Sequence, residues 1–317
     1  MAYRLGTSSS DILTAVDYLR SGGVVGVPTE TVYGLAAAAF NIDAVSEIYR
    51  LKGRPANNPL ILHIHHQDQI DQLATTIPEA LPRLVEAFWP GPLTVVLKSK
   101  TSVPDIVRAG GDTVAIRLPS HSVLQQVLTT IDEPLAAPSA NRSNHISPTT
   151  ALHVEHDFPE DPFPILDAGP TVTGLESTVI SLVGAPTVLR LGATSVEALR
   201  EILPEITTHI PEQQVDSPGT SKRHYAPRTP FHIWADPNLT TEDGVLLFGT
   251  PVPRGADHVW DLGDDPVQAG RRLYAALREM DKSRLRNLYV VLPNHDQTKP
   301  TDWLAITDRL RRATQSK

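Results

Sequence analysis

Short apolar runs alternate with amphipathic segments along most of the chain, and this alternation constrains the fold more than any other feature. In the first amphipathic segment, Ile12, Val16 and Leu19 recur at helical spacing behind a Ser10 cap. Strands that alternate with helices build a sheet-centred α/β domain, which is the fold class we expect. The expected strands are residues 24–27, 60–64, 93–98, 114–118 and 179–183, and the expected helices are 11–20, 44–51, 81–88 and 196–203.

A stretch rich in Pro, Ser, Thr and Gln, from about Pro204 to Pro230, interrupts this pattern and predicts a linker. Beyond it the alternation resumes, with expected strands at 231–235, 245–249 and 288–292 and expected helices at 266–280 and 302–312. A chain of 317 residues also favours one large and one small domain over a single core. We therefore expect a first domain over 1–205, a linker over 206–230 and a small α/β domain over 231–317.

Composition excludes several kinds of site. The chain has no cysteine, which removes disulfides, thiolate nucleophiles, thiolate zinc sites and iron–sulfur clusters. Its formal net charge of -8 argues against a surface that neutralises many phosphates, so we expect no tight direct binding of tRNA. The first residues lack the apolar core of a signal peptide, and no apolar run approaches the roughly 20 residues that span a bilayer. A cytoplasmic protein without membrane contact is expected.

The familiar nucleotide and metal motifs are missing from the sequence. Residues Gly169 to Gly174 have the glycine spacing of a P-loop but continue with Leu175-Glu176 instead of Lys and Ser or Thr. No G-x-G-x-x-G, H-E-x-x-H or G-x-S-x-G stretch occurs. His63 and His65 face the same side of a strand, but a catalytic metal site usually needs three protein ligands. The sequence assigns no third ligand, so we expect no metal site made by the protein.

Hydroxyl side chains follow or precede several expected strands. They occur in Pro28 to Gly34, in Pro138 to Asn141 and in Leu175 to Thr178. Open α/β sheets bind ligands at strand ends, although Ser, Thr and Asn are also common there as turn caps. Ser147 followed by Pro148 predicts the N-cap and first residue of a helix toward His156, a position where anions bind well.

Two cationic segments are open to two interpretations each. Lys52-Gly53-Arg54-Pro55 has no acidic neighbour, so it either binds phosphate or complements the dipole at the end of a helix. Arg117 lies in an otherwise apolar strand, where an unpaired guanidinium is costly. It therefore needs an anionic partner, which is either a carboxylate of the protein or the carboxylate of a substrate.

In chain order, these segments together resemble the Sua5/YrdC family of threonylcarbamoyl-AMP synthases. The S-P-G linker that ends in His224-Tyr225-Ala226-Pro227, with the domain that follows it, is similar to the longer Sua5 type. The resemblance implies a YrdC-like twisted open sheet with flanking helices, plus a small Rossmann-like C-terminal α/β domain. The matching segments are 26–34, 52–63, 88–94, 114–119, 138–148, 174–178 and 188–190.

The resemblance also implies a reaction. L-threonine, bicarbonate or CO2 and ATP, with Mg2+, would give threonylcarbamoyl-AMP and pyrophosphate. This is the first step toward N6-threonylcarbamoyladenosine at position 37 of tRNA, and a separate threonylcarbamoyl transferase would act on the tRNA. The chemistry would proceed through a threonine carbamate whose oxygen attacks the α-phosphorus, so positioning and charge neutralisation would do most of the catalysis.

Site residues follow from the resemblance position by position. Lys52 and Arg54 are the expected catalytic residues, because cations stabilise the negative charge that develops during transfer. Tyr225 in the linker is implied to cover the nucleotide, and Arg117 suits the carboxylate of threonine. The threonine-side positions are Thr31, His63, Arg117, Ala137 and Ser177, and the ATP-side positions are Lys52, Arg54, Asn58, Thr113, Ser139, Asn141, Ser147 and Arg190.

Other functions stay open at this point. An RNA-binding module would need clustered Lys and Arg with exposed aromatics, whereas aromatic residues make up 5% of the chain. A carbamoyltransferase of the YrdC-containing kind would carry further catalytic domains that this sequence lacks. The C-terminal domain could have a regulatory or scaffold role that its motifs do not disclose.

Overall fold

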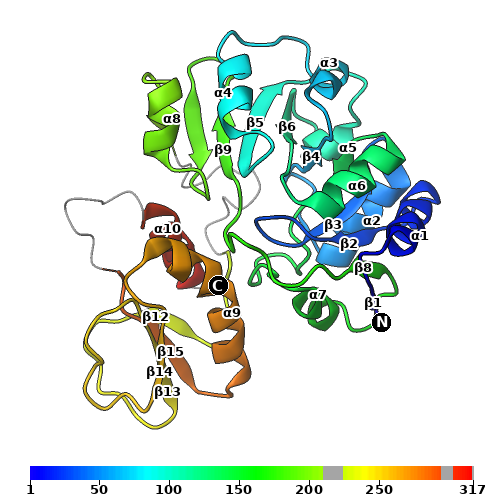
Figure 1. Cartoon of the computed structure of the whole chain (residues 1–317). Coiled ribbons are helices and arrows are strands. Elements are labelled where there is room, and N and C mark those ends of the chain that lie inside the picture. The colour runs from blue at the N-terminus through cyan, green and yellow to red at the C-terminus, as the bar shows by residue number, and fades with distance from the viewer. Residues whose placement is uncertain (210–223, 294–302, 316–317) are drawn as a thin grey trace.

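The computed structural model describes residues 1–209, 224–293 and 303–315. It confirms the expected fold class, with a large mixed sheet flanked by helices and a second, smaller parallel sheet (Figure 1). The strand order of the large sheet is β1-β8-β2-β3-β7-β4-β6-β5-β9-β10-β11. Its strands are β1 (Tyr3–Leu5), β2 (Val25–Val27), β3 (Gly34–Ala38), β4 (Ile61–His63), β5 (Leu93–Lys98), β6 (Thr113–Arg117), β7 (Leu135–Ala136), β8 (Pro164–Leu166), β9 (Thr178–Ser181), β10 (Thr187–Arg190) and β11 (Thr207–Thr208).

Helices cover both faces of this sheet because alternate residues of its strands point to opposite sides. In β3, Ala36 packs in a core with helices α1 and α6, whereas Leu35 and Ala37 pack in another core with α2 and α7. The helices of the large domain are α1 (Ser9–Arg20), α2 (Ile42–Lys52), η1 (Gln67–Gln69), α3 (Ile70–Leu73), α4 (Leu81–Phe88), α5 (Asp105–Arg108), α6 (Ser122–Ile131), α7 (Ala151–Asp157) and α8 (Val196–Ile202).

The C-terminal domain is a four-stranded parallel sheet in the order β12-β15-β13-β14. Its helices α9 and α10 lie between this sheet and the large domain (Figure 1). One hydrophobic core runs through both domains and joins Leu175 and Leu191 to Leu273 and Ile306. The elements are β12 (Phe231–Ile233), β13 (Asp243–Leu247), β14 (His258–Asp261), α9 (Pro266–Lys282), β15 (Asn287–Val290) and α10 (Leu304–Ala313).

Two expected helix starts are wrong. The first helix is capped by Ser8 rather than Ser10, because Ser8 and Asp11 form a reciprocal capping box. The helix expected from Ser147-Pro148 begins at Ala151, where the Thr150 side chain accepts a hydrogen bond from the His153 amide. The Pro148 carbonyl instead accepts a hydrogen bond from the amide of Tyr33, which keeps this segment outside the helix.

The expected linker is described in part. Residues 210–223, which include the S-P-G segment, lie outside the described residues. Thr207 and Thr208 form β11 at the edge of the large sheet, and description resumes at His224. None of the helices that the structure describes is long and apolar enough to cross a bilayer.

Candidate active site

A polar cavity of about 50 Å³ opens at the point where several strands of the large sheet end. His63 and Arg117 are the last residues of β4 and β6 and lie side by side in register, because these strands are parallel. Ser177 directly precedes β9, and Arg190 ends the antiparallel neighbour β10. The cavity is lined by Thr29, Thr31, Val32, Tyr33, Gly34, Arg54, Ile61, His63, Arg117, Ala137, Pro138, Ser139, Glu176, Ser177, Arg190, His224 and Tyr225.

All the predicted threonine-side residues line this cavity. Neighbouring side chains hold two of its hydroxyl groups in place. Thr31 Oγ1 accepts a hydrogen bond from Arg117 Nη1 at 3.0 Å. The Ser177 hydroxyl pairs with Thr94 at 2.8 Å and accepts from Arg190 Nη2 at 3.0 Å. The structure therefore brings together the set Thr31, His63, Arg117, Ala137 and Ser177.

Arg117 has a protein carboxylate as its partner. Its Nη2 atom lies 2.7 Å from Oε1 of Glu30, and its Nε donates to the carbonyl of Gly91 at 3.2 Å. Burial alone would raise the pKa of Glu30, but the adjacent guanidinium of Arg117 brings it below its ordinary value. Glu30 is thus an anion, and the buried charge of Arg117 is balanced without a ligand.

His63 is a neutral base in this cavity. Burial, followed by the nearby positive charge of Arg117, lowers the pKa of His63 to about 3. His65 lies apart, with its Nε2 atom 3.1 Å from Oδ1 of Asp132. At neutral pH, His63 can therefore donate or accept a hydrogen bond without adding charge to the site.

The predicted ATP-side residues fall into three groups. Arg54, Ser139, Arg190 and Tyr225 line the cavity. Lys52, Asn58, Asn141 and Ser147 are buried beside it and contact its walls. Thr113 lies at the other end of β6 from Arg117, about 13 Å away along the strand.

Lys52 holds a wall of the cavity in this structure. Its Nζ atom donates to the carbonyl oxygens of Ser139 and Asn141, each at 2.6 Å. Burial, followed by the charge of Arg54, lowers the pKa of Lys52 well below its ordinary value. The expected helix end is also observed, since Gly53 caps α2 in a left-handed conformation with φ of 58°.

Arg54 and Arg190 bring positive charge to the same cavity. Arg54 is anchored to the carbonyls of Asn58 and Pro59 at 3.0 and 2.7 Å, and burial lowers its pKa to about 10. Arg190 donates through Nε and Nη2 to the Ser177 carbonyl at 3.1 and 2.9 Å. Both guanidinium groups are protonated at neutral pH, so the lining offers cations to an anionic ligand.

Thr113 lines a second cavity, on the same face of the sheet as Arg117. This cavity has a volume of about 410 Å³ and is also lined by Asn57 and Arg108. Between Thr113 and Arg117, Ala115 packs with Ile61 and other apolar residues, which makes this part of the face apolar. An extended ligand could therefore lie along this face, from the polar cavity toward Thr113.

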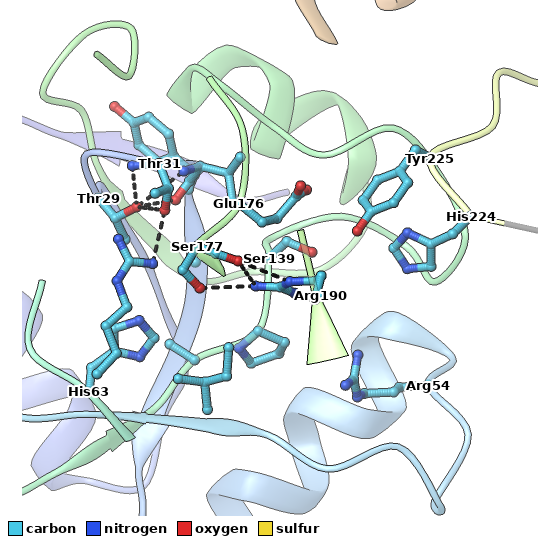
Figure 2. A pocket seen from close by; sticks show the side chains of 17 residues that line it. Thr29, Thr31, Arg54, His63, Ser139, Glu176, Ser177, Arg190, His224 and Tyr225 are labelled. Atoms are coloured by element: carbon cyan, nitrogen blue, oxygen red, sulfur yellow. Dashed lines mark hydrogen bonds between the residues drawn. The ribbon is translucent and has the colours of Figure 1, made fainter. Parts of the chain in front are cut away.

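His224 and Tyr225 enter the cavity from the linker side (Figure 2). Tyr225 adopts a left-handed backbone conformation with φ of 61°, which is unfavourable for a residue that is not glycine. Its hydroxyl and Nδ1 of His224 are buried, and neither has a hydrogen-bond partner among the described residues. Burial lowers the pKa of His224 to about 3 and raises that of Tyr225 to about 12. The strained backbone directs two unsatisfied polar groups into the site.

No described group of three His, Cys, Asp or Glu side chains could hold a metal ion. The acidic residue that lines the cavity, Glu176, is ion-paired with Arg309 at 3.1 Å. The described residues therefore do not fit a protein-held Mg2+ site, and any Mg2+ would need the oxygens of the nucleotide as its ligands.

Sequence reasoning missed several residues that build the site. Glu30 stands within the P-T-E-T-V-Y-G segment, and the need of Arg117 for an anion pointed to such a residue. Thr94 and His224 stand in segments that match the family, but the sequence assigned no role to either side chain. Tyr274 and Arg309 come from the C-terminal domain, and only tertiary structure places them beside Glu176.

Comparison with known proteins identifies both domains. The Sua5/yciO/yrdC family, described as "Telomere recombination", matches residues 17–192, and the family described as "Threonylcarbamoyl-AMP synthase, C-terminal domain" matches residues 194–315. The threonylcarbamoyl-AMP synthase of Pyrococcus abyssi is 39% identical over 96% of this chain and 94% of its own length. That of Bacillus subtilis is 37% identical over 98% of this chain and 94% of its own length.

A solved structure agrees over both domains. The crystal structure of Pyrococcus abyssi Sua5 complexed with L-threonine superposes with a TM-score of 0.89 at 35% identity. The match covers 99% of this chain and 97% of that one. The cavity, its arginines and the trailing parallel sheet thus occur in a chain that belongs to the Sua5/YrdC family, in its long form with the C-terminal domain of threonylcarbamoyl-AMP synthases.

Proposed function

We propose that this protein is an L-threonylcarbamoyladenylate synthase, which condenses L-threonine, bicarbonate or CO2 and ATP to threonylcarbamoyl-AMP and pyrophosphate. The observation that carries the proposal is the single cavity in which Arg117, His63 and Thr31 lie opposite Arg54 and Arg190. The carboxylate of an amino acid and the phosphates of ATP are anionic, and this lining presents guanidinium groups to both. The full-length similarity to threonylcarbamoyl-AMP synthases supports it.

Arg117 is the proposed anchor for the carboxylate of threonine, with Thr31, His63, Ala137 and Ser177 around the rest of the amino acid. The amine of threonine loses a proton and bonds to CO2, which gives a carbamate. A carbamate oxygen then attacks the α-phosphorus of ATP, and the bond from that phosphorus to pyrophosphate breaks. Arg54 and Arg190 stabilise the charge on the phosphates, while Lys52 and Asn58 keep Ser139 and Arg54 in place.

Tyr225 and His224 are proposed to cover the nucleotide, because a carbamate and an activated acyl phosphate both react with water. The apolar part of the face between Arg117 and Thr113 supports an extended position for ATP along the sheet. When bound to ATP, Mg2+ would neutralise charge on its phosphates, beside the guanidinium groups of Arg54 and Arg190.

The product is proposed to serve tRNA modification through a separate threonylcarbamoyl transferase in the cytoplasm, where ATP and tRNA are available. The net charge of -8 fits a protein that releases a small-molecule product and does not itself bind RNA tightly.

The decisive measurement is pyrophosphate release from ATP, Mg2+ and bicarbonate with L-threonine, with L-serine or with no amino acid. We expect release that depends on threonine and is lost in Arg117→Ala. If folded protein that binds ATP shows no threonine dependence, the synthase assignment is wrong, and an RNA-binding role or another carbamoyl transfer must be considered.

A further inference from the structure

The carboxylate of Glu176 lines the cavity, yet two of its partners come from the C-terminal domain. The hydroxyl of Tyr274 lies 2.8 Å from Oε2, and Nε of Arg309 donates to the same oxygen at 3.1 Å. From the large domain, the hydroxyl of Ser147 donates to Oε1 at 2.6 Å. Glu176 is 6% exposed, so this carboxylate depends on protein groups and not on water for its stabilisation.

Arg309 reaches three segments of the cavity wall at once. Besides its contact with Glu176, its Nη2 donates to the carbonyl of Leu191 at 2.6 Å, and its guanidinium lies 5.0 Å from the ring centre of Tyr225. Glu176 and Leu191 directly adjoin Ser177 and Arg190, which line the cavity. The side chain of Arg309 is fully buried, at 1% exposure, and lies outside that lining.

We propose that Arg309 is a positioning residue for the nucleotide site, supplied by the C-terminal domain to fix the segments of Ser177, Arg190 and Tyr225 and to neutralise Glu176. Tyr274 assists, since it bonds Glu176 and its ring stacks on Tyr225 with 5.7 Å between ring centres. The proposal rests on the proposed function in taking ATP as the ligand, and it gives the C-terminal domain a part in building the site.

ATP binding should depend on Arg309 for an electrostatic reason. ATP and the threonine carbamate are anions, and an unpaired Glu176 in the wall would repel them in a region of low dielectric. Arg309 neutralises that charge from outside the cavity lining, while Arg190 and Arg54 line the cavity itself. A merely structural interdomain contact would not produce this dependence on the charge of Glu176.

The test compares Arg309→Met with Asp157→Asn. Asp157 forms another buried interdomain ion pair, with Arg278 at 2.6 Å, and does not line the cavity. We expect Arg309→Met to raise the Kd for ATP, measured by titration calorimetry, by about ten-fold or more, and Asp157→Asn to change it by less than about two-fold at a similar loss of Tm. Equal effects of the two variants on the Kd would overturn the proposal.

The double variant Glu176→Gln with Arg309→Met tests the charge directly. It removes the carboxylate that Arg309 neutralises, so we expect it to bind ATP more tightly than Arg309→Met alone. If the double variant binds ATP as weakly as Arg309→Met, or more weakly, then Arg309 does not act by neutralising the charge of Glu176.

Tyr274→Phe covers the case in which Arg309→Met does not fold. It removes one hydroxyl from Glu176 and keeps the stacked ring, and we expect an increase of about three-fold in the Kd for ATP. An unchanged Kd would count against the proposal. If the unmodified protein binds ATP but releases no pyrophosphate with threonine, the proposed function fails, while these affinities still decide the role of Arg309.

Discussion

Nη2 of Arg117 lies 2.7 Å from Oε1 of Glu30, and both side chains are buried beside the cavity. The pair explains how a charged residue can end an apolar strand in the absence of a ligand. It also means that a variant of Arg117 changes two things at once, because it removes a proposed substrate anchor and leaves a buried carboxylate without its partner.

Arg117→Ala should therefore lose threonine binding and also unfold at lower urea, with a fall of about 3–5 kcal/mol in the free energy of unfolding. The double variant Glu30→Gln with Arg117→Ala should recover most of the stability but not the threonine binding. Urea unfolding and calorimetric titration of L-threonine measure the two effects separately. Threonine binding by either variant at the original affinity would refute the carboxylate anchor.

Acidification should destabilise the protein through His63, His153 and His224. All three have a pKa of about 3 in the folded state, against about 6.5 in an unfolded chain. Below pH 6.5 the unfolded state therefore binds more protons, and stability falls until the pH reaches about 3. Each histidine should contribute roughly 1.4 kcal/mol per pH unit within that window.

Urea unfolding at several pH values between 7.5 and 4.5 measures this slope. His224→Asn should reduce it, since one of the three groups is then absent. If the slope of the variant equals that of the unmodified protein, the folded state keeps His224 protonated and our account of its burial is wrong.

Tyr225→Ala should slow pyrophosphate release by roughly ten-fold or more, because the buried hydroxyl and the ring both leave the nucleotide side of the cavity. Tyr225→Phe separates the two contributions, since it retains the cover and loses only the hydroxyl. Tyr289→Phe in β15 serves as a control outside the cavity. Pyrophosphate release at the unmodified rate in Tyr225→Ala would exclude a lid role.

Gly192→Ala should damage the site without any change of charge. A Cβ atom at this position would lie 2.4 Å from the carbonyl oxygen of Glu176 and 2.5 Å from that of Ser177. The segment of Ser177 must then move, at a cost of about 1–3 kcal/mol, and the KM for threonine should rise.

Gly184→Ala is the matched control, because its φ of 77° strains an alanine but nothing lies within 4 Å of the added Cβ. It should lower the free energy of unfolding by about 1 kcal/mol and leave the KM for threonine unchanged. A Gly192→Ala enzyme with the original KM would show that the segment of Ser177 adapts freely.

Local patterns predicted much of the large domain. Leu81–Phe88 and Leu93–Lys98 have the expected bounds, since apolar periodicity alone determines them. The missed strand Gly34–Ala38 consists of Gly, Leu and Ala, which lack the β-branched side chains typical of strands. The missed helix Ser122–Ile131 has no side-chain cap hydrogen bond to mark its start.

The cavity was predictable where motif and chemistry coincide. Arg117, Thr31 and Ser177 stand at strand ends, and the structure brings them together. For Lys52 a phosphate contact and a helix-end role were both open, and the structure adds that its ammonium group donates to two carbonyls of residues about 90 positions away. Such contacts depend on the packing of distant segments, so neither periodicity nor spacing could reveal them.

The separation of 133 residues between Glu176 and Arg309 has a consequence for synthesis of the protein. While the chain emerges from the ribosome, the large domain is complete before α10 has been translated, and Glu176 then lacks its arginine. The nascent domain should therefore bind ATP weakly, as should any fragment cut before α10. Helix α10 would thereby delay activity until translation has passed Arg309.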